Sequence, residues 1–115
     1  MPPDRSWQLC VEDILEGIER IHAYTSGMSF EDFRADTRTI DAVERNFAVI
    51  GEAARHIPDE VSAEYPDIPW NLMRGMRDIL VEYFGVSPEG IWRTIEEDLP
   101  PMVPLLQRML QSARD

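Results

Sequence analysis

The chain has 115 residues, 43% of them hydrophobic, which suits a single folded domain spanning residues 1–115. Its 22 acidic and 11 basic residues give a formal net charge of −11. Because nucleic-acid binding depends on neutralising phosphates with basic side chains, this charge by itself argues against a nucleic-acid partner. A cleft that concentrates positive potential would be needed to overcome it. All the basic residues are Arg, a bias that genome composition explains most simply.

The sequence predicts a cytoplasmic protein without a membrane segment. No apolar run approaches the roughly 20 residues needed to cross a bilayer, and the N-terminus has no apolar signal-peptide core. Cys10 is the one cysteine, so it cannot form an intramolecular disulfide. It recurs with Trp7, Val11 and Ile14 at helical spacing, which predicts a buried thiol rather than a reactive one.

Apolar residues that recur every three or four positions predict helices through the N-terminal half. The first long helix is expected at residues 6–24, with Ser6 as its N-cap. A short helical turn follows at 29–33. A second long helix is expected at 37–56 and is ended by Pro58.

The C-terminal half is also predicted to be helical. A short helix is expected at 59–65, a longer one at 69–85, and another from 87 to about 95. Three prolines must kink or restart this last helix before the apolar face at 105–110: Pro100, Pro101 and Pro104. No segment alternates with period two, so no strand is expected. The predicted fold is all-α, an up-and-down helical bundle of four to five main helices.

The residues alone give little support for familiar catalytic or metal chemistry. His22 and His56 are single histidines on different predicted helices, so no metal site is expected. Each suits a helix end or an exposed surface. No glycine-rich phosphate loop or serine nucleophile motif occurs, and Cys10 has no evident base partner. We therefore expect no cofactor.

The segment at residues 73–86 resembles the signature of the HepT-like HEPN ribonuclease toxins. That signature reads arginine, a polar residue, three mostly apolar residues, histidine, any residue, tyrosine. Arg77 and Asp78 fit its beginning and Tyr83 fits its end. The histidine is missing, and the segment is one residue short, as if a residue had been deleted just before Glu82. Glu82 therefore occupies the histidine's position.

The resemblance covers nearly the entire chain, because the other family markers occur in the family's order. They lie at residues 11–21, 25–33, 42–53, 68–70 and 86–100. Each marker is weak alone, but their order makes the signal strong. The resemblance implies a HEPN-like homodimer whose two motif helices form a composite cleft. Trp70 and Trp92 would suit its subunit interface.

The family also implies a function. Its members are toxins of type VII toxin-antitoxin systems, encoded with a minimal nucleotidyltransferase antitoxin. They cut RNA, for which transfer RNA is a candidate substrate, without a metal and with the ribose 2′-hydroxyl as nucleophile. By resemblance, Arg77 would bind the scissile phosphate and Asp78 would orient Arg77 or the site's histidine. Tyr83 would be the motif tyrosine, which can receive AMP from the antitoxin.

Other residues are expected to support this site. Arg74, one helical turn before Arg77, could extend a phosphate-binding edge. Arg45, Asn46 and Glu52 match family markers on the preceding helix, and we expect them to support the site or the dimer. Without the resemblance, Arg77 would be interpreted as a partly buried arginine paired with Asp78, Glu52 or an acid of another helix.

The departures from the motif predict weakened or absent catalysis. A glutamate at position 82 can accept a proton at neutral pH but donates one poorly. Positions seven apart share a helix face, but Tyr83 is only six residues after Arg77. The first reading is therefore a weakened or inactive HepT-like toxin. The second is a non-catalytic HEPN dimer that binds a nucleotidyltransferase or a nucleotide. A histidine omitted when the sequence was recorded would restore the ordinary motif.

Overall fold

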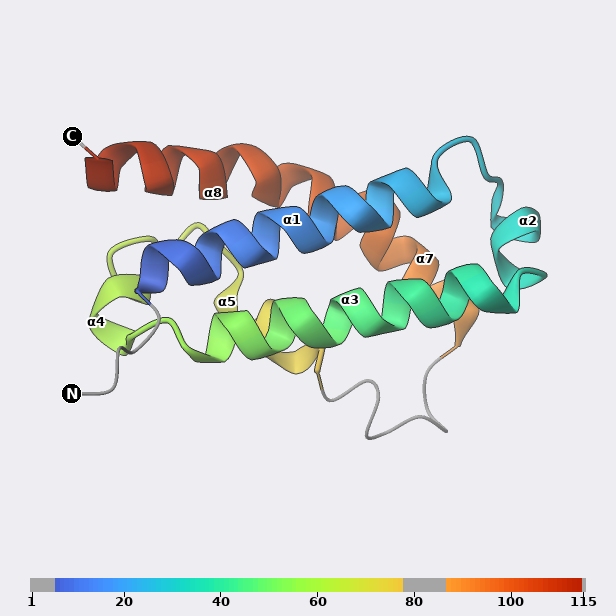
Figure 1. Ribbon diagram of the computed structural model, residues 1–115, viewed down its shortest axis with the longest axis horizontal. Helices are drawn as coiled ribbons and strands as arrows, with labels where there is room; N and C mark the ends of the chain where they lie inside the picture. Colours follow the sequence, from blue (N-terminus) through green and yellow to red (C-terminus); the bar gives the residue numbers. More distant parts are fainter. Residues whose placement is uncertain (1–5, 78–86, 115) are drawn as a thin grey trace.

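The computed structural model describes residues 6–77 and 87–114 of the chain. All the regular secondary structure in these two ranges is helical, which confirms the predicted all-α fold. The two long amphipathic segments of the N-terminal half form α1 (Trp7–Thr25) and α3 (Thr37–Arg55). Figure 1 shows them side by side and antiparallel, joined at one end through the short α2 (Phe30–Arg34).

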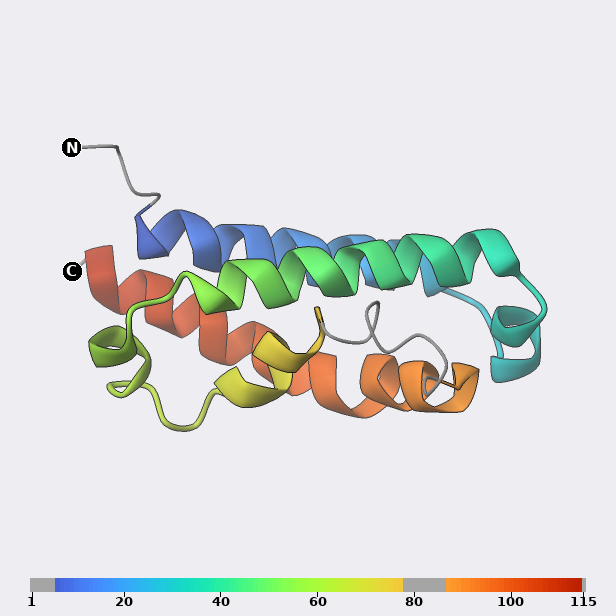
Figure 2. The ribbon, with the colours of Figure 1, turned by 90° about the horizontal axis from the view of Figure 1, so that it is seen from below.

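A second layer of helices lies beneath α1 and α3 (Figure 2). It consists of α5 (Trp70–Gly75), α7 (Pro88–Arg93) and α8 (Leu99–Arg114). In this layer α8 runs antiparallel to α1 and packs along it. The arrangement is an up-and-down bundle in the part of the chain that the structure describes.

Local side-chain bonds set the starts of the first three helices. The Ser6 hydroxyl accepts a hydrogen bond from the Leu9 amide, so the predicted N-cap is confirmed. Ser29 caps α2, and the Asp36 carboxylate accepts from the Thr39 amide at the start of α3. The Thr39 backbone hydrogen bond lowers the pKa of Asp36. Such caps depend on neighbouring residues only, which is why the sequence alone could locate the cap at Ser6.

Two expected helices are shorter in the structure. The short helix α4 spans Asp59–Ser62 rather than 59–65. The helix expected at 69–85 begins as α5 but ends at Gly75, and Met76 and Arg77 lie in a turn. The remainder of the expected helix falls on residues 78–86, outside the described residues.

The three prolines near residue 100 are accommodated without a break. Between α7 and α8 the chain forms a π-helical segment, η2 (Thr94–Asp98). The Leu99 amide there bonds to the Thr94 carbonyl, five residues earlier. This wider turn comes directly before Pro100, whose ring could not fit a regular α-helical turn at that point without a clash. The predicted kink or restart therefore takes the form of a π segment, and Pro104 lies inside α8.

A single hydrophobic cluster fills the space between the two layers. Cys10 is 2% exposed within it, which confirms the predicted buried thiol. Trp92 packs its ring against Phe33, with centroids 5.1 Å apart, and so joins α7 to α2. Trp70 is 6% exposed, and its indole nitrogen donates to the Tyr65 carbonyl at 3.1 Å. Trp70 therefore packs inside the subunit, and its expected place at a subunit interface is wrong.

Among the described residues, no helix is long and apolar enough to cross a bilayer. The same residues contain no group of three or more His, Cys, Asp or Glu side chains arranged to hold a metal ion.

Candidate active site

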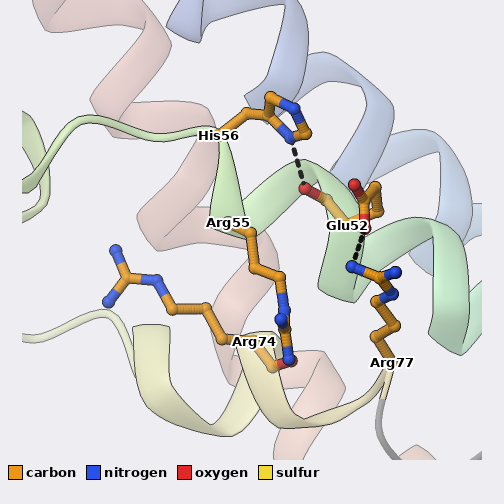
Figure 3. Close-up of polar contacts among 5 residues, drawn as sticks. All are labelled: Glu52, Arg55, His56, Arg74 and Arg77. Atoms are coloured by element: carbon orange, nitrogen blue, oxygen red, sulfur yellow. Dashed lines mark hydrogen bonds and ion pairs between the residues drawn. The ribbon is translucent and has the colours of Figure 1, made fainter.

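Arg77, the first residue of the recognised motif, lies in the turn after α5 and contacts α3. Its Nη1 atom is 2.7 Å from the Glu52 Oε2 atom (Figure 3). The two side chains are 49% and 48% exposed, so the guanidinium is held on one side and open to solvent on the other. An ion pair this exposed contributes only about 0–1 kcal/mol to stability. Its main effect is on the direction in which Arg77 points.

The backbone of Arg77 lies so close to α3 that only a glycine of α3 fits at the point of contact. The contact lies at Gly51, which is buried and directly precedes Glu52. A methyl group at Gly51 would be 2.5 Å from the backbone nitrogen of Arg77 and 2.9 Å from its Cβ. These separations are too short for a side-chain carbon, so this crossing requires glycine. Sequence reasoning did not single out Gly51 as a site residue. A glycine inside a helix, where it costs about 1 kcal/mol relative to alanine, was the available signal.

An open groove of about 550 Å³ begins at the Arg77–Glu52 pair and continues along the exposed side of α3. The residues that line it are Asp41, Glu44, Arg45, Ala48, Val49, Glu52 and Arg77. The structure therefore brings together three of the expected site residues, which are Arg45, Glu52 and Arg77. Three carboxylates and two guanidiniums face the same groove, so its formal charge is slightly negative.

One of these carboxylates has an altered affinity for protons. Burial, and secondarily the Asp41 carboxylate, raise the pKa of Glu44 above its ordinary value. A protonated Glu44 would leave the groove electrically balanced, which suits an anionic ligand better than three ionised acids do.

Arg74 extends in a different direction from Arg77 (Figure 3). Its Nε atom lies 3.4 Å from the Ala54 carbonyl, and its Nη2 atom lies 3.4 Å from the Ser62 hydroxyl. Arg74 thus connects α5 to the end of α3 and to α4, and it does not line the groove. These contacts direct two of the five N–H donors of the guanidinium toward the protein. A phosphate contact by Arg74 stays a prediction.

Asn46 also differs from its expected neighbours. It is 7% exposed, and its Nδ2 atom donates to the Ala42 carbonyl at 2.9 Å. It lines a smaller groove of about 210 Å³ on the other side of Arg45, between α1 and α3. Arg45 is exposed and borders both grooves. Asn46 therefore faces away from Arg77.

Three further motif residues were predicted as site residues. Asp78, Glu82 and Tyr83 lie outside the described residues. His22 and His56, the two histidines of the chain, are both exposed and lie at the ends of α1 and α3, as expected. The Nδ1 atom of His56 lies 2.8 Å from the Glu52 carbonyl oxygen (Figure 3).

Comparison with known proteins identifies the family of this chain. The family model described as "Ribonuclease HepT-like" matches residues 14–109. The chain belongs to the HepT-like ribonuclease family. This assignment agrees with the markers found along the sequence and with the helical fold.

Curated relatives support the same assignment. A protein of Thermococcus cleftensis named "Probable ribonuclease HepT" is 43% identical over 99 residues, which cover 85% of this chain and 90% of that protein. Proteins of Methanocaldococcus jannaschii and Caldanaerobacter subterraneus, both named "Putative RNase", are 33% and 36% identical. These matches cover 95% and 90% of this chain, and 91% and 94% of the relatives. No solved structure gives a significant match.

Proposed function

We propose that this chain is a HepT-like toxin of a type VII toxin-antitoxin system, derived from a metal-independent endoribonuclease and weakened or inactive in its present sequence. It acts in the cytoplasm as a homodimer, and RNA is the substrate of the reaction that its family carries out. The observation that supports the site is Arg77, whose guanidinium is half exposed and directed along a groove by Glu52.

The proposed reaction needs only protein side chains. A base removes the proton of the ribose 2′-hydroxyl, whose oxygen attacks the neighbouring phosphorus. The bond from phosphorus to the 5′-oxygen breaks, that oxygen takes a proton, and a 2′,3′-cyclic phosphate remains. Arg77 stabilises the extra negative charge on the phosphate oxygens as the new bond forms. Asp78 orients Arg77 in this scheme.

The missing histidine limits this reaction. No histidine occurs between residues 77 and 86. General acid–base catalysis typically contributes about 10²–10⁴-fold, so its loss reduces the rate greatly. Glu82 accepts a proton but is a poor donor at neutral pH.

The same observation supports a second candidate function. A HEPN dimer without its general acid/base would still present Arg77 and the groove to a partner. We propose binding to a minimal nucleotidyltransferase antitoxin, or to a nucleotide, as this second function. Tyr83 is the proposed site of AMP transfer in such a complex.

Two features of the described surface favour the homodimer. Val49, which lines the Arg77 groove, is 42% exposed, and Leu72 on the nearby α5 is 40% exposed. A partner subunit would remove both from water. It would also bring the Arg77 of the second copy to the cleft.

Cleavage of single-stranded RNA and transfer RNA by the chain and by its Arg77→Ala variant tests the main proposal. Cleavage products should be sparse for the chain and absent for the variant. Robust cleavage that survives Arg77→Ala would show that this site is not the ribonuclease site.

A further inference from the structure

The absence of a side chain at Gly51 sets the position from which Arg77 reaches the groove. We infer that Gly51 is a positioning residue for Arg77, and that Gly51 and Glu52 together fix the backbone and the guanidinium of that arginine. This inference rests on the proposed role of Arg77 in phosphate binding. It adds a residue that touches no substrate but determines where the phosphate-binding group stands.

The first step of the argument is the close approach itself. Gly51 is buried in the last two turns of α3, and the Arg77 nitrogen, Cα and Cβ all surround the position where its Cβ would lie. The distances are 2.5 Å to the nitrogen, 3.1 Å to Cα and 2.9 Å to Cβ. The nearest atom belongs to the backbone, so no rotation of a side chain could relieve the clash. A larger residue must push the turn after α5 away from α3.

The second step is the consequence for the ion pair. Glu52 directly follows Gly51, and its carboxylate contacts the Arg77 guanidinium at 2.7 Å. One helical turn of α3 thus contacts both ends of Arg77, its backbone through Gly51 and its head group through Glu52. Displacing the backbone would break this alignment. The guanidinium would then sample many directions, and the benefit of a pre-oriented charge would be lost.

The other glycines of the described helices show that this arrangement is particular to Gly51. A methyl group at Gly75, two residues before Arg77, would meet no atom within 4 Å. At Gly17 the nearest atom would be Cγ1 of the Ile50 side chain, at 2.9 Å. Gly75→Ala is therefore a matched control, because it makes the same substitution close to Arg77 without a clash.

Arginine side-chain ¹⁵N NMR spectroscopy of the full chain tests the inference without requiring catalysis. The Arg77 Nε–Hε resonance is assigned by its loss in Arg77→Lys. We expect the parent and Gly75→Ala to share a resonance typical of an ion-paired guanidinium. In Gly51→Ala it should move to the position of solvent-exposed arginines. An unchanged Arg77 resonance in a folded Gly51→Ala protein would overturn the inference.

Glu52→Gln provides a second variant in case Gly51→Ala does not fold. Glu52 is about half exposed, so its substitution should leave the helical circular dichroism spectrum unchanged. The Arg77 resonance should again move toward that of exposed arginines. If the Arg77 resonance does not move, Glu52 does not orient the guanidinium, and the inferred joint role of Gly51 and Glu52 is wrong.

The link to function is tested separately, by binding of a single-stranded RNA oligonucleotide over a range of salt concentrations. Loss of one phosphate contact should lower the slope of log K against log salt by about 0.7. We expect Gly51→Ala and Arg77→Ala to show this loss, and Gly75→Ala to retain the parent slope. If Gly51→Ala alters the NMR resonance while the parent binds no RNA, the positioning role stands and the proposed RNA site fails. If Gly51→Ala keeps the parent slope, the role in phosphate binding is wrong.

Discussion

Arg55 and Arg74 join the end of α3 to α5, because the Arg55 Nε atom donates to the Arg74 carbonyl oxygen at 3.4 Å. The Arg74 side chain returns to α3 at the Ala54 carbonyl. Arg74 in α5 and Arg77 in the turn after it therefore perform different tasks. Arg74 braces the crossing of α5 over α3, whereas Arg77 lines the groove. The two side chains extend in different directions (Figure 3).

Arg74→Ala should lower the free energy of unfolding by about 1 kcal/mol, because it removes long, partly exposed hydrogen bonds to Ala54 and Ser62. It should leave the salt dependence of RNA binding unchanged, since the side chain does not line the groove. Urea unfolding and oligonucleotide titrations would measure these two effects. If Arg74→Ala instead reduced the slope of log K against log salt and left the stability unchanged, Arg74 would be a phosphate contact.

Insertion of a histidine between Val81 and Glu82 should raise RNA cleavage by roughly 10²–10⁴-fold, because it restores the proton-transfer group and the spacing of the motif. Insertion of alanine at the same point is the control, since it restores the spacing alone. Rates are measured with excess enzyme on labelled RNA. Equal gains from both insertions would assign the defect to the spacing, and Arg77→Ala should abolish any gain.

Glu44→Gln should raise the Tm by roughly 1–3 °C at pH 7 and have little effect near pH 4. The folded-state pKa of Glu44 is raised by burial and by Asp41, so the folded protein favours the protonated carboxyl. The stability from this group is therefore present below its ordinary pKa and is lost as pH rises through the raised value. Calorimetry at both pH values, with the exposed Glu60→Gln as control, tests the sign. A lower Tm at pH 7 would contradict it.

The homodimer should appear in light scattering at micromolar concentration as a mass of about twice the 13.3 kDa of one chain. Val49→Glu should raise the dissociation constant at least about tenfold, because it places a charge on the proposed interface beside the groove. Leu9→Glu is the control, since Leu9 is similarly exposed but lies at the start of α1, outside both grooves of α3. A monomeric parent chain would rule out the dimer.

Co-expression with a minimal nucleotidyltransferase encoded beside this chain should give a complex that survives affinity purification. The family's helical framework is retained around the altered motif, so binding can outlast catalysis. Intact mass measurement detects transfer of AMP units, and Tyr83→Phe identifies the acceptor. Co-purification without added mass would support binding alone. If the two proteins do not associate, the proposed partnership is wrong for that pair.

The sequence by itself determined the features that depend on short-range spacing. Apolar periodicity located α1 and α3, and Ser6 was identified as the start of α1, where its hydroxyl accepts from an amide three residues away. The family markers also lie within short segments, so the HepT-like assignment and the loss of the motif histidine could be read directly. Arg45, Glu52 and Arg77 were named as candidate site residues on the same basis.

The tertiary structure decided which of those residues meet. Arg77 and Glu52 are 25 positions apart, and only the packing of α5 on α3 brings their side chains to 2.7 Å. The same packing gives Gly51 its role, turns Arg74 away from the groove and buries Trp70 inside the subunit. Periodicity shows that a residue faces the interior of a fold, but it does not specify the element on the other side. That choice depends on how whole helices cross, because the backbones can approach only where the side chains between them are small enough.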